Sequence, residues 1–163
     1  MIELTSTPII ILAILGGVGV ALPVINVALK ERGSMMSYGI ATLIALFAAI
    51  GYVLYQLALD HVAPAAIFSQ DVLVDDAFGS LFAIAMLIVA IFTTVGSFSY
   101  MKNKANPSIY FSLILLSAIG MVLVAYSTDL VMLFVAWELM SIPTYILVAV
   151  SYTHLTLPTI YSV

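Results

Sequence analysis

The chain has 163 residues, of which 64% are hydrophobic and 7% are charged, and its formal net charge is −4. Soluble domains carry about 25% charged residues, so this chain has too little polar surface to cover a water-facing globule, and lipid is its expected solvent. It has no basic patch that would bind nucleic acid. It has no cysteine, which excludes disulfides, thiol catalysis and iron–sulfur ligation by this chain, and His61 and His154 have no metal-ligand spacing.

Long apolar runs dominate the sequence. A helix that spans a bilayer needs about 20 largely apolar residues. Because the runs are continuous rather than alternating, membrane β-strands are excluded. The sequence therefore predicts an all-α, polytopic membrane bundle. Its five expected transmembrane helices are Pro8–Leu29, Met36–Leu59, Phe78–Tyr100, Ser108–Tyr126 and Leu130–Val150.

Residues between the runs give local signals for where helices begin. Asn106 precedes Pro107, which is typical of an N-cap followed by proline in the first helical turn. Ser127, Thr128 and Asp129 offer capping oxygens before the fifth run. The weak alternation of Gln70–Asp75 indicates a short strand in the long loop between the second and third runs.

The basic residues predict the orientation of the chain in the membrane. All four Lys and Arg side chains lie in the first and third loops, as Lys30, Arg32, Lys102 and Lys104. The second and fourth loops carry aspartates instead. Because cytoplasmic loops collect Lys and Arg, the N-terminus is expected outside the cell, with the first and third loops in the cytoplasm.

Small and hydroxyl-bearing residues gather near the end of the third run, at Thr93, Thr94, Gly96, Ser97 and Ser99. Two interpretations are open. These side chains could line a path for water, or they could bond the backbone of their own helix or a neighbouring helix, which is the commoner use of Ser and Thr in membrane helices.

A single carboxylate, Glu138, lies well inside the fifth run. Insertion scales assign a central Asp about 2.5–3.5 kcal/mol, and ionisable residues kept in membrane spans are usually functional. At 3.6 residues per turn, Ser141 and Tyr145 share its face. Pro143 leaves the Leu139 carbonyl without its helical partner, so water could enter there. Glu138 is therefore expected to be a functional residue, although a structural acid bonded to a neighbouring helix is the alternative.

The run Asp129–Ala149 resembles the fifth helix of the antiporter-like subunits of respiratory complex I, in which an acid is followed by a proline and an aromatic residue. The segment Val74–Phe82 is similar to the start of the third helix in that family. The spelling Ser141-Ile142-Pro143 leans toward subunit N of NADH-quinone oxidoreductase, and the archaeal counterpart in the reduced-deazaflavin dehydrogenase is equally compatible. Multisubunit sodium/proton antiporters share the fifth-helix pattern.

The resemblance implies a proton-translocating membrane subunit in which Glu138 is the key glutamate and lysines on later helices relay the proton. It implies an inner (plasma) membrane location, with other membrane subunits of a respiratory complex as partners. It also implies that this chain binds no cofactor, and that quinone, flavin and iron–sulfur centres belong to partner subunits. The alternatives are a subunit of a sodium/proton antiporter and a non-catalytic membrane scaffold.

The last thirteen residues of the chain differ in composition from residues 1–150. Residues 1–150 are expected to be the N-terminal five-helix part of such a subunit. Ser151–Val163 lacks the basic residues expected at a cytoplasmic end, does not resemble the family, and looks like translated sequencing-adapter read-through. It is therefore expected to be a non-native tail.

Resequencing the genomic locus tests this expectation about the tail. The thirteen residues of Ser151–Val163 should be replaced by a continuing, family-like sequence, because their composition breaks from the spans before them. Recovery of the same residues from genomic DNA would show that the tail is native.

Overall fold

A computed structural model of the chain describes residues 7–28, 34–59, 72–102 and 106–152. Within them, five helices are long and apolar enough to cross a membrane, which confirms the predicted all-α membrane bundle. Their observed ends lie within two residues of the predicted ends, because hydropathy sets both. The helices are α1 (Thr7–Ala28), α2 (Met35–Ala58), α3 (Ala77–Met101), α4 (Pro107–Tyr126) and α5 (Leu130–Tyr152).

Side-chain oxygens cap three of the helices at their first turns. The Ser34 hydroxyl accepts from the Met36 backbone at 3.3 Å, and Asp76 Oδ1 accepts from Gly79 N at 2.7 Å. The predicted cap of the fifth helix is confirmed, since Asp129 Oδ2 accepts from Val131 N at 3.0 Å. Such bonds satisfy donors that a helix leaves free at its start, which matters most where water is scarce.

The start of α4 departs from this pattern. Asn106 is the residue before the helix and Pro107 is its first residue, as predicted. The Asn106 side chain makes no capping bond, however, because its backbone adopts the left-handed conformation with φ of 58°. Asparagine tolerates this conformation better than most residues, so it serves here to turn the chain into α4.

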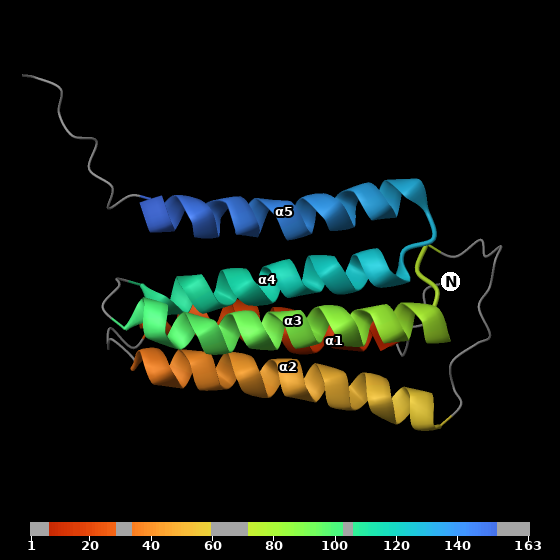
Figure 1. The fold of residues 1–163 in the computed structure, drawn as a ribbon, viewed down its shortest axis with the longest axis horizontal. Coiled ribbons are helices and arrows are strands. Elements are labelled where there is room, and N and C mark those ends of the chain that lie inside the picture. The colour runs from red at the N-terminus through yellow and green to blue at the C-terminus, as the bar shows by residue number, and fades with distance from the viewer. Residues whose placement is uncertain (1–6, 29–33, 60–71, 103–105, 153–163) are drawn as a thin grey trace, which may run out of the picture.

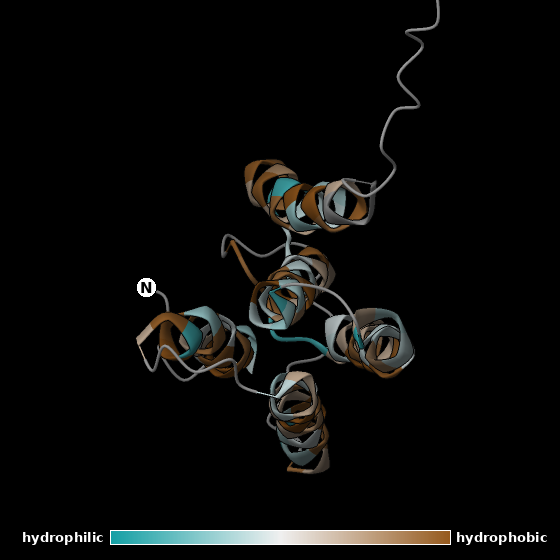
Figure 2. Ribbon diagram, turned by 90° about the vertical axis from the view of Figure 1, so that its left-hand side faces the viewer, coloured by the Kyte–Doolittle hydropathy of each residue, from teal (hydrophilic) through white to brown (hydrophobic). Residues whose placement is uncertain are grey.

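The arrangement centres on α4. Figure 2, looking along the helices, shows α4 between α5 on one side and α1, α2 and α3 on the other. Within the described residues, α4 contacts every other helix, whereas α5 contacts α4 alone. Figure 1 accordingly shows α5 lying along α4 at the edge of the bundle, with α2 at the opposite edge. The position of α5 therefore depends on a single interface.

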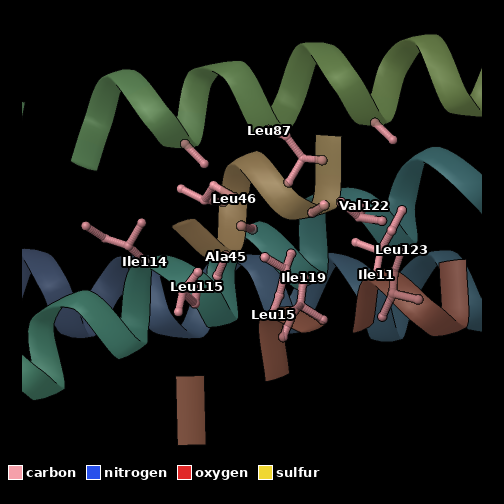
Figure 3. Close-up of a cluster of buried hydrophobic side chains, with 14 of the residues drawn as sticks. Ile11, Leu15, Ala45, Leu46, Leu87, Ile114, Leu115, Ile119, Val122 and Leu123 are labelled. Atoms are coloured by element: carbon pink, nitrogen blue, oxygen red, sulfur yellow. The ribbon is translucent and has the colours of Figure 1, made fainter. Parts of the chain in front are cut away.

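Aliphatic side chains fill the middle of the part formed by α1 to α4. Leu15, Leu46, Leu87 and Leu115 come one from each of these helices, and each is fully buried. Figure 3 shows their side chains directed into the same cluster. Lipid is as apolar as leucine, so this cluster stabilises the bundle mainly through close packing rather than through escape from water.

A short backbone pairing joins the segment before α3 to the turn between α4 and α5. Val74 N donates to the Tyr126 carbonyl at 3.0 Å, and Thr128 N donates to the Val72 carbonyl at 3.2 Å. The pairing is a single antiparallel bridge between Leu73 and Ser127, and no strand forms among the described residues. The short strand predicted for Gln70–Asp75 is thus reduced to this bridge, and its first two residues lie outside the described ranges.

The hydroxyls near the end of α3 bond within their own helix. Thr93, Thr94 and Ser97 each donate to the backbone carbonyl one turn earlier, at 2.9, 2.8 and 2.6 Å. Ser97 also lies 3.0 Å from the hydroxyl of Tyr110 on α4. The backbone-bonding interpretation is therefore the correct one, and these groups carry no argument for a water path.

The helix ends fix which loops share a side. The end of α1, the start of α2, the end of α3 and the start of α4 all lie at one end of the bundle (Figure 1). Lys102 lies at that end, and the other three basic residues of the chain fall outside the described ranges. The bundle thus places both basic loops on one side, as the charge pattern requires.

Cysteine labelling tests the side on which that end faces. The chain has no native cysteine, so single replacements at Ser34 and Asn103 can be read without background. Both should be protected from an impermeant maleimide in intact cells and react after permeabilisation, because basic loops stay in the cytoplasm. Thr128→Cys at the opposite, exposed end is the matched control and should react from outside. External labelling at Ser34 and Asn103 would reverse the orientation.

Candidate functional site

The fifth helix packs on α4 through one narrow stripe. Ala136 and Pro143 are buried, and their seven-residue spacing puts them on the same face of the helix. Leu139 and Leu147 pack beside them against the core. Most other described side chains of α5 are exposed. One face of α5 is therefore fixed by α4, and the opposite face is free of contact with the described helices.

The closest approach of the two helices is at Gly120 of α4. A Cβ atom at this position would lie 2.4 Å from the backbone nitrogen of Met140 and 2.7 Å from its Cα. These are backbone atoms that cannot swing aside, so only glycine fits. Small residues that let membrane helices meet backbone to backbone are a recurring device. The sequence analysis did not single out Gly120, although the pair of small residues Ser117 and Gly120 in an apolar run could have indicated a close helix contact.

Hydroxyl groups reinforce this contact. Ser117 of α4 donates to the Met140 carbonyl at 3.3 Å, and Thr144 of α5 donates to the same carbonyl at 2.8 Å. The two hydroxyl oxygens lie 3.4 Å apart. In a medium without water, such bonds satisfy the backbone and hold the register of the two helices.

Pro143 lies on the packed side of the helix. It is buried against α4, and α5 continues beyond it to Tyr152. The proline still removes the donor that the Leu139 carbonyl would normally meet. The backbone at Leu139 lies against Gly120 of α4 rather than at an open surface, and the entry of water at the proline stays a prediction.

Glu138 points away from the rest of the bundle. It follows the buried Ala136 by two positions, which turns its side chain about 200° around the helix. The residue is exposed, and so is Tyr145 on the same face, at 70%. Ser141 is half-buried and donates to the Trp137 carbonyl at 2.8 Å, not to the acid. Glu138 therefore faces none of the other four described helices, and the expectation that it faces the interior of the complete protein stays a prediction.

Among the described residues, the carboxyl group of Glu138 has no basic partner. No Lys or Arg lies within the five described helices, and Lys102 is the one described basic residue, just after α3. Within the described residues, Glu138 forms no hydrogen bond or ion pair. A carboxylic acid at this depth in lipid must be neutral, paired or wetted, and each state requires neighbours. Such neighbours would have to lie on the face of α5 that the described helices leave open.

Five membrane-length helices, with an acid on the open face of the last, define a multi-pass membrane protein with an ionisable group inside its span. Curated relatives agree with this class. NADH-quinone oxidoreductase subunit N of Desulfitobacterium hafniense is 35% identical over 153 residues, which covers 91% of this chain and 28% of that protein. Subunit N 1 of Solibacter usitatus is 33% identical over 141 residues, covering 86% of this chain and 27% of that protein.

A second type of complex also appears among the relatives. F(420)H(2) dehydrogenase subunit N of Methanosarcina mazei is 35% identical over 81 residues, which covers 50% of this chain and 16% of that protein. The resemblance to the subunit N family, indicated by the motifs around Glu138, is thereby confirmed over most of this chain. No protein-family model and no solved structure matches it.

Replacing Gly120 by alanine tests the interface that positions the site. The added methyl group would meet the Met140 backbone, so the helices must separate, and overpacking of this kind costs about 1–3 kcal/mol. We expect a lower melting temperature in detergent. Gly17→Ala is the matched control, because a Cβ there meets nothing within 4 Å and alanine favours the helix. Equal melting temperatures for the two variants would contradict the close approach.

Proposed function

We propose that this chain is part of the proton-translocating membrane subunit of a redox-driven respiratory quinone oxidoreductase, with NADH or a reduced deazaflavin as electron donor to the complex. The observation that carries the proposal is Glu138, an acid inside a membrane helix on a face that the neighbouring helices leave open. The names of the relatives supply the class of complex.

The proposed mechanism is binding and release of a proton at the Glu138 carboxylate. A nearby ammonium group favours the charged form of a carboxylic acid, and an apolar surrounding favours the neutral form. A lysine that approaches and then leaves the open face of α5 would therefore switch the proton affinity of the acid. That lysine must come from outside the five helices, which contain none. The relatives offer room for it, since this chain spans 28% of the Desulfitobacterium hafniense protein.

Redox chemistry is assigned to partner subunits. The sequence given has no cysteine, the usual ligand of iron–sulfur clusters, and we propose that those centres belong to partner subunits. We likewise place flavin and quinone with the partners. The complex is proposed to lie in the inner (plasma) membrane, where the other membrane subunits would cover the open face of α5 or extend the bundle.

Two other functions were open from the sequence. A non-catalytic scaffold predicts that Glu138 bonds within the bundle, whereas the acid is exposed and lacks such a bond among the described residues. That difference favours the relay. A sodium/proton antiporter subunit would use the same helix, but the relatives described above are oxidoreductase subunits by name.

The test is Glu138→Gln in the complete subunit, assembled in its complex in membrane vesicles. Glutamine keeps the size and hydrogen-bonding capacity of the side chain and removes the titrating proton. We expect donor-driven proton uptake to fall by about tenfold or more, as when other positioned proton-transfer groups are removed. Assembly of the complex should be retained.

Asp129→Asn is the matched control on the same helix. It removes a carboxylate at the start of α5, while the remaining side-chain oxygen can still accept from Val131 N. Proton uptake should stay at the wild-type rate. If the Glu138→Gln complex assembles and pumps at the full rate, Glu138 is a structural acid and the proposed relay is wrong.

A further inference from the structure

A group of polar side chains joins the elements at the end of the bundle where α1 and α3 begin. Asp75 precedes α3, and its Oδ2 accepts from Thr7 N, the first residue of α1, at 2.9 Å. The hydroxyls of Ser80 on α3 and Tyr126 on α4 lie 3.1 Å apart and are buried. A carboxylate at the first amide of a helix is favoured by the helix dipole, so Asp75 anchors α1 to α3.

Two oxygens in this group have no hydrogen-bond partner among the described residues. They are Asp75 Oδ1 and Thr7 Oγ1, and both are inaccessible to solvent. The Thr7 residue as a whole is fully buried. Buried polar atoms are nearly always satisfied, because an unmade bond costs about 1–3 kcal/mol and more for a charged group. The two atoms belong to residues that the bond from Thr7 N to Asp75 Oδ2 already joins.

The chemistry of the pair fits a water molecule better than a metal ion. A water needs two to four polar partners, and it can donate to the carboxylate while it accepts from, or donates to, the hydroxyl. A hard cation needs about six oxygen ligands. No cluster of three acidic or histidine side chains that could hold a metal occurs in the described part of the chain.

We propose that Asp75 Oδ1 and Thr7 Oγ1 bind a structural water molecule, which links the start of α1 to the segment before α3. The same segment pairs with the turn after α4 through the bond from Val74 N to the Tyr126 carbonyl. The water therefore belongs to a connected set of bonds that ties α1, α3 and the α4–α5 turn at one end of the bundle. This role is independent of proton transfer at Glu138.

Thr7→Val tests whether a water is bound or the hydroxyl is unsatisfied, because the two cases predict changes in Tm of opposite sign. Valine keeps the shape of the side chain and leaves the Thr7 amide bond to Asp75 intact. If a water is bound, valine strands it beside a carboxylate, and Tm of the full chain in detergent should fall by about 3–6 °C. If no water is bound, valine removes a buried unpaired hydroxyl, so Tm should stay the same or rise.

Two further variants complete the comparison. Thr7→Ser retains the hydroxyl and should have a higher Tm than Thr7→Val. Thr94→Val is the control for an ordinary buried hydroxyl, which bonds the Ala90 carbonyl of its own helix at 2.8 Å, and its Tm should fall less than that of Thr7→Val. A Thr7→Val variant that melts at or above the wild type, or at or above Thr7→Ser, would overturn the proposal.

A direct observation covers the case in which Thr7→Val does not accumulate. A density map of the wild-type protein at a resolution that shows ordered water should contain a peak within about 3.2 Å of both oxygens. Absence of that peak, with the rest of the group well defined, would refute the site.

Discussion

The contact between Gly120 and the backbone of Met140 decides where the candidate site points. Within the described residues α5 touches only α4, so this one interface sets its rotation and depth. Its hydroxyl bonds and the buried Pro143 lie on the same face. Helical periodicity then directs Glu138 to the opposite side. A glycine on one helix thus determines the exposure of an acid on the next, although the two side chains never meet.

Among the described residues, most of the polar side chains discussed above bond the backbone, whereas Glu138 does not. The hydroxyls of Thr93, Thr94 and Ser97 bond their own helix, and Asp75 and Asp76 anchor the starts of α1 and α3. Each of these groups is explained by local satisfaction of the backbone. Glu138 alone combines an ionisable side chain, a position inside a span and the lack of a local bond among the described residues. This combination of features, rather than its polarity alone, makes Glu138 the candidate functional residue.

Hydropathy and capping were sufficient to predict the helices, because membrane length and orphan backbone donors constrain every helix in the same way. Periodicity also correctly grouped Glu138 with Tyr145. It could not tell which face of α5 meets the bundle, because that depends on Gly120, a residue of another helix. The sequence therefore could not show that Glu138 faces away from the four other described helices. The burial of Pro143 against α4 could likewise be learned only from the packing.

The aliphatic cluster around Leu15, Leu46, Leu87 and Leu115 has an electrical consequence. A region of low dielectric constant that excludes ions acts as an insulator, so a membrane potential falls across it rather than being screened. Moving one elementary charge across a full 100 mV costs about 2.3 kcal/mol. A proton that reached Glu138 from either surface would cross part of that drop. The membrane potential would thus change the fraction of Glu138 that carries a proton. The packed helices beside it would maintain this effect, because they exclude the ions that would screen the potential.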